Sequence, residues 1–349
     1  MRRFAYMTLL LVVLCGVAHG ARLNAMIVDG QNNHDWKATT PVMEELLTET
    51  GRFRVDVATS PASSKSQKDF NPEFGKYDVV VLNYNGDMWS RRTRDAFVDY
   101  VSGGGGVVVV HAADNAFGNW KEYNEIIGLG GWGGRNKESG PYVYLENGEL
   151  VHDHESDGPA GAHEGFARFV VDTRMPGHPI MQGMPAQWYQ RDELYNYMRG
   201  PGKNMTILAT AYSGRPKNQG GSGRHEPMLF TIAYGEGRVF HTMLGHDVRS
   251  MRDEGFALTF VRGAEWAATG EVTIPITEDI PRPLAPNEAL GELDEKASYH
   301  PVQEVLAELA ALADQPEKLA EVEATLIEYL EDPDTPFLAL QATCNALGI

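Results

Sequence analysis

Cysteine is nearly absent from this chain, which has two cysteines among 349 residues. Cys15 lies in an N-terminal apolar run, and Cys344 lies near the C-terminus. If the N-terminal segment is removed, Cys344 alone remains. The sequence therefore excludes an intrachain disulfide and a cysteine nucleophile in the main part of the mature chain.

Basic residues are also few. The chain has 30 Lys and Arg residues against 48 Asp and Glu residues, a formal net charge of −18, and loss of Arg2 and Arg3 with a signal segment would make it −20. A polyanion is a poor partner for nucleic acid or an anionic membrane surface. We therefore expect neither nucleic acid nor an anionic membrane as the partner.

One marked apolar run lies at the N-terminus. Residues 1–20 read MRRFAYMTLLLVVLCGVAHG, with two arginines, an apolar stretch and small residues before Ala21. This pattern is typical of a secretory signal peptide, and it is too short to span a bilayer stably. Leu14 stands where a lipoprotein signal would have a small residue. We expect an exported, periplasmic protein with no membrane span after signal removal.

The composition changes near residue 278. Residues 278–349 carry 16 acidic and 3 basic residues, and the segment DIPRPLAPN at 279–287 has three prolines, as linkers often do. Farther on, apolar residues recur with a helical period and resemble part of a HEAT-type array. The predicted organisation is a signal peptide (1–20), an α/β domain (21–277), a linker (278–298) and a short all-α segment of partial HEAT-like helices (299–349).

Strand and helix patterns alternate through the α/β domain. Strands are predicted at 23–28, 54–59, 77–83, 107–111, 166–171, 205–212, 228–235 and 237–244, and helices at 41–50, 90–102, 120–127 and 256–268. Thr40 is the expected cap of the first helix, with Pro41 at its first position. The alternation predicts a mostly parallel, flavodoxin-like sheet covered by helices on both faces. The last three strands could form an antiparallel extension.

Two apolar strands run into histidines. VVVVHAADN (107–115) ends its strand on His111, and HTMLGHD (241–247) leads to His246. Open α/β sheets bind ligands beyond the carboxyl ends of their strands, so both histidines are candidate catalytic residues. The loop DGQNNHDW (29–36) leaves the first strand at the same edge, which makes His34 and Trp36 candidate substrate-binding residues, together with Asn115. A capped loop without function is the alternative for this segment.

A series of motifs resembles the ThuA family, the trehalose-utilisation proteins. The motifs are VVVVHAADN, HPI (178–180), RDELY (191–195), GRHEPML (223–229), YGEGRVFHTMLGHD (234–247) and EWAATG (265–270). The resemblance implies a fold like that of class I glutamine amidotransferases, in which a cysteine nucleophile occupies a strand-to-helix elbow. His111 stands at the matching position. The resemblance also implies metabolism of disaccharides or glycosides, through 3-keto sugars made by a partner sugar dehydrogenase.

Several alternative chemistries are disfavoured. His111 cannot act as a thiolate, and GGSGR around Ser222 lacks the second glycine of G-x-S-x-G. GLGGWG (128–133) matches a dinucleotide fingerprint by letter but follows a helix rather than a strand, so we expect no nucleotide cofactor. The glycine-rich segment 130–141, with Trp132, could be a flap over a sugar or a plain surface loop.

Two polar motifs supply further site candidates. RHEP contributes Arg224 for substrate binding and Glu226 as a catalytic acid, and RDELY contributes Asp192 as a second candidate acid. Glu193 and Tyr195 of RDELY are candidate substrate-binding residues. Two alternatives stay open: Arg224 and Glu226 could pair with each other, and one of the two acids of RDELY could face solvent.

The segment 151–165, VHDHESDGPAGAHEG, is rich in histidines and acids. Such side chains can bind a divalent metal, but the spacing matches no known closed site, and a charged loop is favoured. The cofactor is therefore unknown, and a divalent metal remains open.

These observations favour a carbohydrate-processing protein that acts on glycosides or 3-keto-glycosides by acid/base, or metal-assisted, elimination or hydrolysis. His111 or His246 would be the base, and Glu226 or Asp192 the acid. Two other classes remain: a direct glycoside hydrolase with paired carboxylates, and a non-catalytic carbohydrate-binding or scaffolding module.

Overall fold

The computed structural model describes residues 22–215, 217–276, 280 and 281. The expected signal peptide, most of the linker and the HEAT-like helices lie outside these residues. Within the described part of the chain, no helix combines the length and the apolar composition needed to cross a membrane.

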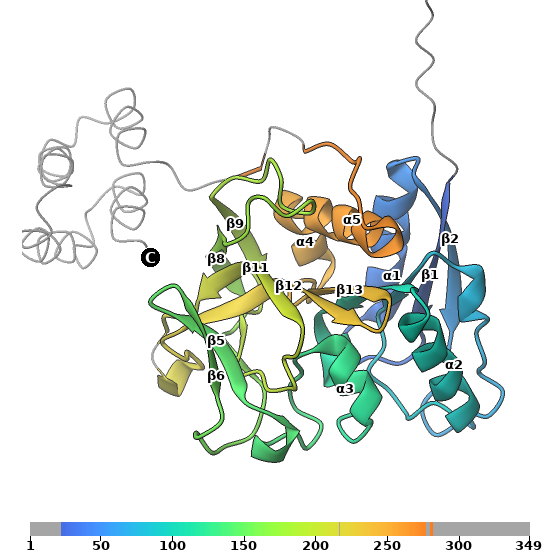
Figure 1. Ribbon diagram of the computed structural model, residues 1–349, viewed down its shortest axis with the longest axis horizontal. Helices are drawn as coiled ribbons and strands as arrows, with labels where there is room; N and C mark the ends of the chain where they lie inside the picture. The colour runs from blue at the N-terminus through green and yellow to red at the C-terminus, as the bar shows by residue number, and fades with distance from the viewer. Residues whose placement is uncertain (1–21, 216, 277–279, 282–349) are drawn as a thin grey trace, which may run out of the picture.

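An eleven-stranded mixed sheet runs through the described domain (Figure 1). Its parallel half has the order β2-β1-β3-β4-β13, and each neighbouring pair in that order is parallel. The strands of this half are β1 (Leu23–Asp29), β2 (Phe53–Thr59), β3 (Val79–Leu82), β4 (Gly106–Val110) and β13 (Gly237–Thr242). The valines of β3 and β4 are almost completely buried. Buried β-branched runs are typical of central parallel strands, as the sequence predicted.

The other half of the sheet is antiparallel. It continues from β13 in the order β12-β11-β8-β9, and the hairpin β5–β6 pairs with β12. Its strands are β5 (Tyr142–Glu146), β6 (Glu149–Asp153), β8 (Ala167–Thr173), β9 (Gln187–Asp192), β11 (Met205–Tyr212) and β12 (His225–Tyr234). The short strands β7 (Ala162–His163) and β10 (Tyr195–Asn196) form a separate pair. The expected antiparallel extension is present in part: β11 and β12 belong to it together with β5, β6, β8 and β9, whereas β13 also pairs in parallel with β4.

Helices cover both faces of the sheet (Figure 1). They are α1 (Trp36–Glu49), α2 (Arg91–Ser102), α3 (Lys121–Ile127), α4 (Val248–Met251) and α5 (Glu254–Thr269). Helix α5 packs on the central strands β4 and β13 and contacts α1, whereas α2 and α3 pack against each other. The α/β fold predicted from the sequence is confirmed.

Helix α1 begins five residues before the predicted position. Its cap is Asp35, whose Oδ1 accepts a hydrogen bond from the backbone N–H of Ala38 at 3.2 Å. Pro41 lies inside the helix, where it removes one hydrogen bond to the carbonyl of Lys37. The proline therefore did not mark the helix start, and Trp36 belongs to the helix rather than to the preceding loop.

Candidate functional site

The central strand β4 ends in a sharp turn at His111. This residue has φ = +45°, and His111–Asn115 form a single 3₁₀ turn directly after the strand. A left-handed backbone is uncommon for a residue with a side chain, and such strain concentrates at functional sites. The elbow expected from the sequence is therefore present, with an imidazole at its apex.

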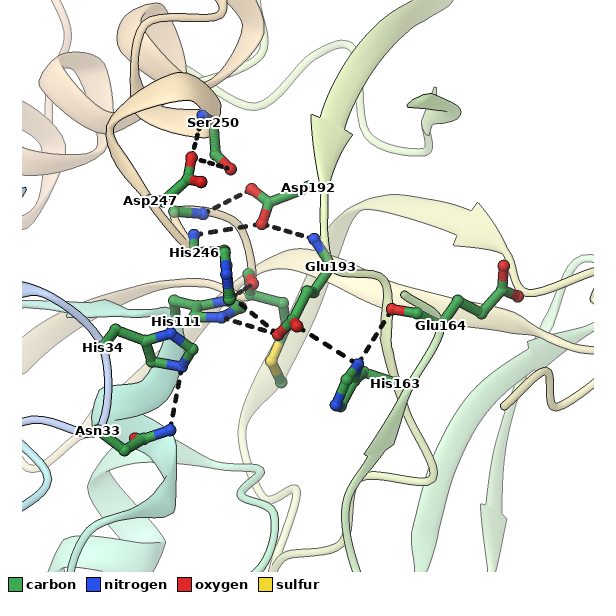
Figure 2. A network of polar contacts seen from close by, with 12 residues as sticks. Asn33, His34, His111, His163, Glu164, Asp192, Glu193, His246, Asp247 and Ser250 are labelled. Carbon is green, nitrogen blue, oxygen red and sulfur yellow. Dashed lines mark hydrogen bonds and ion pairs between the residues drawn. The ribbon is translucent and has the colours of Figure 1, made fainter. Parts of the chain in front are cut away.

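Three imidazoles converge at this edge of the sheet (Figure 2). Ring centroids are 4.5 Å apart for His34 and His246, 4.9 Å for His34 and His111, and 5.5 Å for His111 and His246, with interplanar angles of 66° to 88°. The rings come from the segments that follow β1, β4 and β13. They meet because the carboxyl ends of parallel strands lie at one edge of a sheet.

Glu193 brings a carboxylate to the three rings. Its Oε2 lies 3.0 Å from His246 Nδ1 and 3.8 Å from His111 Nε2, while its Oε1 lies 3.5 Å from His163 Nδ1. Ligand atoms of His34, His111, Glu193 and His246 all lie within 4.8 Å of one another. These four residues, called the histidine–glutamate cluster below, could hold a metal ion.

The pKa values of the three histidine rings shift in different directions because their surroundings differ. Burial lowers the pKa of His34, and it lowers that of His111 well below the usual value, with neighbouring imidazoles acting in the same direction. Burial also opposes ionisation of His246, but the Glu193 carboxylate outweighs it and raises the pKa of His246. Glu193 shows the converse: burial opposes its ionisation, yet His246 and its neighbours lower its pKa. The cluster thus combines two imidazoles favoured in the neutral form, those of His34 and His111, with an ionised carboxylate that favours the charged form of His246.

Asp192 supports the cluster through hydrogen bonds to the backbone. Its Oδ2 accepts a hydrogen bond from the backbone N–H of Gly245 at 2.7 Å, and its Oδ1 accepts from the N–H groups of His246 at 3.2 Å and Glu193 at 2.8 Å. The side chain is fully buried, and burial raises its pKa to about 7 despite these bonds. Asp192 therefore joins the segment that carries Glu193 to the loop that carries His246, which makes it a positioning residue in our account.

A cavity of about 390 Å³ opens beside the cluster. Its lining consists of Asn33, His34, Asn115, Trp132, His163, Glu193 and Tyr195. Tyr195 stacks on His111 with ring centroids 4.1 Å apart and meets Trp132 edge-on at 4.9 Å. Aromatic faces beside amide, imidazole and carboxylate groups suit a sugar, which offers both hydroxyls and apolar faces.

Four of the ten candidate residues line the cavity, and three more, His111, His246 and Asp192, lie in or behind the cluster beside it. The other three lie elsewhere. Trp36 begins α1 and contacts the Lys37 ammonium, outside the cavity lining. Arg224 packs over the ring of Tyr144 at 3.9 Å and lies 3.9 Å from Asp153. Glu226 is buried in β12, also outside the lining.

For two residues that line the cavity, Trp132 and His163, the sequence offered only weak evidence of a role in the site. Trp132 lies in the glycine-rich segment and lines the cavity, as the flap interpretation would require. His163 is the one histidine of the 151–165 segment in the lining, because strand β7 pairs with β10 beside Glu193. Asp153 of that segment instead accepts hydrogen bonds from the N–H groups of Glu155 and Ser156. In the described part of the chain, the histidine–glutamate cluster is the one group arranged for a metal.

His241 and Asp247, which are close to His246 in the sequence, stabilise the fold rather than contribute to the cluster. His241 is buried within β13, and its Nδ1 lies 2.7 Å from the carbonyl oxygen of Ile127, as expected for a core histidine. Asp247 caps α4 by accepting from the N–H groups of Arg249 and Ser250. The Asp247 carboxylate is therefore used as a helix cap.

The Glu226 carboxyl should make stability depend on pH. Burial raises the pKa of Glu226 to about 7. Between the unfolded pKa near 4.5 and this value, the unfolded chain loses its proton and the folded chain keeps it, so this contribution to stability falls as pH rises and then levels off above pH 7. Glu226→Gln removes the titration. We expect the free energy of unfolding of the variant, measured relative to that of the unsubstituted protein, to be about 2.5 kcal/mol higher at pH 8 than at pH 5.

Denaturant unfolding of both proteins at the two pH values measures this difference directly. An equal effect of the substitution at pH 5 and pH 8 would contradict the assignment. Loss of turnover in the same variant, with the fold retained, would return Glu226 to the list of candidate acids.

Comparisons with known proteins agree with this architecture. The ThuA family, described as trehalose utilisation, matches residues 24–267. A ThuA-like protein from Parabacteroides merdae is 48% identical, with a TM-score of 0.72 over 75% of this chain and 95% of its own. A ThuA-like protein from Bacteroides uniformis is 18% identical, with a TM-score of 0.48 over 72% of this chain and 93% of its own. No curated protein matches the chain.

The fold and the family match define an α/β protein with a class I glutamine amidotransferase-like fold. The chain belongs to the ThuA family. The family's description suggests a carbohydrate-related role.

Proposed function

We propose that this protein processes glycosides or 3-keto-glycosides at the histidine–glutamate cluster, by elimination or hydrolysis. The observation that carries the proposal is the position of the cluster: two of its members, His34 and Glu193, line a cavity that also presents an indole, a phenol and two amides. A purely structural sheet edge has no need of three converging imidazoles. The strained elbow at His111 supports the same view.

The chemistry of a 3-keto-glycoside suits such a site. The ketone at C3 acidifies the hydrogen on C2, so a base can remove it and leave an enolate. The C1–oxygen bond then breaks as the C1=C2 double bond forms, and the leaving oxygen takes up a proton. An electrophilic centre lowers the barrier by holding the enolate oxygen, and a positioned acid/base group exchanges the protons.

The geometry favours particular residues for these roles. His111 is only 2% exposed, faces Glu193 and lies outside the cavity lining, so we assign it to the cluster itself rather than to the groups that exchange protons with the sugar. His163 is 42% exposed, lines the cavity and contacts Glu193, which makes it our candidate for proton exchange with the sugar. Both oxygens of Asp192 already accept backbone hydrogen bonds, which disfavours Asp192 as the acid.

Direct hydrolysis by paired carboxylates has less support. That mechanism needs two carboxyl groups on either side of the scissile bond. Among the described residues that line the cavity, Glu193 is the sole carboxylate. A non-catalytic carbohydrate-binding role uses the same cavity and differs only in the absence of turnover. The expected export to the periplasm and the partner dehydrogenase remain part of the proposal.

Turnover of matched substrates tests the function. The mature protein is incubated with a panel of glycosides and with their 3-keto derivatives, and release of the aglycone is followed by chromatography. We expect release from the 3-keto forms, at least about 100-fold faster than from the unoxidised glycosides. Equal or faster release from unoxidised glycosides would favour direct hydrolysis, and saturable binding without release would favour the binding module.

A further inference from the structure

We propose that the histidine–glutamate cluster binds one divalent transition-metal ion, with His34, His111, His246 and Glu193 as ligands. This inference does not rest on the proposed carbohydrate function, because metal binding is measured without a substrate. It rests on the hydrogen-bond partners of the buried rings and on the directions from which the rings meet.

The contacts of His111 define which ring nitrogen is free. Its Nδ1 lies 2.6 Å from the carbonyl oxygen of Met243, and because a carbonyl only accepts, Nδ1 carries the proton. With the proton on Nδ1, Nε2 is the ring nitrogen left to act as a ligand. That nitrogen is buried without a hydrogen-bond partner, and it lies 3.8 Å from Glu193 Oε2. The lone pair of His111 Nε2 and the Glu193 carboxylate repel each other. A cation between them would be bound by both.

His246 also directs a ring nitrogen at Glu193. Its Nδ1 is buried and lies 3.0 Å from Glu193 Oε2. A cation bound between the two would replace the proton that otherwise links them. His34 stands edge-on to both other rings, with interplanar angles of 66° and 78°. The cluster therefore offers imidazoles from three different directions and a carboxylate (Figure 2).

The spacing of the ligand atoms fits a metal after a small contraction. In a tetrahedral site with metal–nitrogen bonds of roughly 2.1 Å, the ligand atoms lie about 3.4 Å apart. The ligand atoms of the cluster all lie within 4.8 Å of one another, so side-chain movements of roughly 1 Å or less bring them to one metal. The supporting contacts are of the kind that orient metal ligands: Met243 fixes the His111 ring, and Asp192 holds the backbone of His246.

The donor set indicates the class of metal. Three imidazoles and one carboxylate suit zinc, manganese, iron or cobalt, whereas magnesium and calcium prefer oxygen ligands. Because His34 and Glu193 also line the cavity, we expect any remaining coordination position to face it. Such a metal would supply the electrophilic centre in a carbohydrate-processing reaction.

Metal content and affinity test this inference. The full chain is purified without chelator, analysed for metals, stripped, and titrated with Zn²⁺, Mn²⁺, Co²⁺ and Mg²⁺ by calorimetry. We expect one Zn²⁺, Mn²⁺ or Co²⁺ per chain, a higher melting temperature on binding, and weaker binding of Mg²⁺. Bound Co²⁺ should also give a visible absorption spectrum that reports imidazole ligation.

Matched variants locate the site. We expect His111→Gln, His246→Gln and Glu193→Gln each to weaken binding by at least about 100-fold. His178→Gln is the control, since that histidine packs on Trp266 outside the cluster, and it should bind as the unsubstituted protein does. His246 is 23% exposed, so its variant should fold even if that of the buried His111 does not.

Two results would overturn the inference: no stoichiometric binding of any of the transition metals to the stripped protein, or binding that the three ligand variants leave unchanged. Metal binding without turnover of any sugar would support this site and contradict the proposed function. Turnover by a protein that binds no metal would support the proposed function and contradict this metal site.

Discussion

Replacing His111 by glutamine is expected to lower turnover of 3-keto-glycosides by at least about 100-fold and to leave the fold intact. His111 occupies the apex of the elbow after β4, stacks on Tyr195 and directs Nε2 toward Glu193. Glutamine preserves much of the side-chain volume and can still donate to the Met243 carbonyl, but it lacks the imidazole lone pair. Steady-state kinetics with circular dichroism and thermal unfolding measure both parts of this expectation.

The matched control is His178→Gln, which makes the same chemical change where the ring packs on Trp266. We expect this variant to retain full activity. If His111→Gln turns over substrate as fast as the control, the histidine-ended strand is not the reacting centre and the assignment fails.

Replacing Asp192 by asparagine should disturb the site through the backbone. The two carboxylate oxygens accept three backbone N–H bonds, whereas asparagine offers one oxygen and directs an NH₂ group at another donor. Because the side chain is fully buried, we expect a loss of about 2–3 kcal/mol in the free energy of unfolding. Glu193 and His246 would lose their relative placement, and turnover should fall by about 10–100-fold.

Kinetics below the melting temperature of the variant separate these two effects. A folded variant whose turnover falls with little change in KM fits a positioning role. Full activity and full stability in the asparagine variant would show that the loop of His246 does not depend on Asp192.

The architecture was largely predictable because the strands carry strong local patterns. The buried valines of β4 and the histidine after them placed His111 at the ligand-binding edge, and the structure shows it there. The hairpin β5–β6 was missed although Asn147 and Gly148 have φ of +53° and +82°, the conformation that an Asn-Gly turn adopts. Strand β5 buries four consecutive residues, so the segment lacks the alternation that would have marked it as a half-exposed strand.

Side-chain placement was harder to predict than the fold. Asp192 and Glu193 are neighbours of the same charge type, and local sequence cannot say which one enters the cluster. The structure buries Asp192 against backbone donors and leaves Glu193 toward the imidazoles, because β9 ends between them. Glu226 follows Arg224 in sequence, yet Arg224 packs on Tyr144 from the β5–β6 hairpin. These outcomes depend on tertiary contacts that local sequence patterns do not record.

Convergence of the three histidines could be predicted only in part. His34, His111 and His246 each follow a strand of the parallel half, so the common edge was inferable. The distance between them depends on the strand order β1-β3-β4-β13, which brings the last strand of the domain beside the central one. His163 arrives from the antiparallel half, and no periodic pattern indicated its approach to Glu193.

Hydrogen exchange at C2 of a 3-keto-glycoside is the most direct test of the central claim, that this cluster performs chemistry on a sugar. The protein is incubated with the substrate in D₂O, and the C2 proton signal is followed by NMR together with release of the aglycone. We expect deuterium at C2 or elimination across C1 and C2 with the unsubstituted protein and with His178→Gln, and neither with His111→Gln. If the C2 proton is lost no faster with metal-loaded protein than without protein, the result would contradict the account.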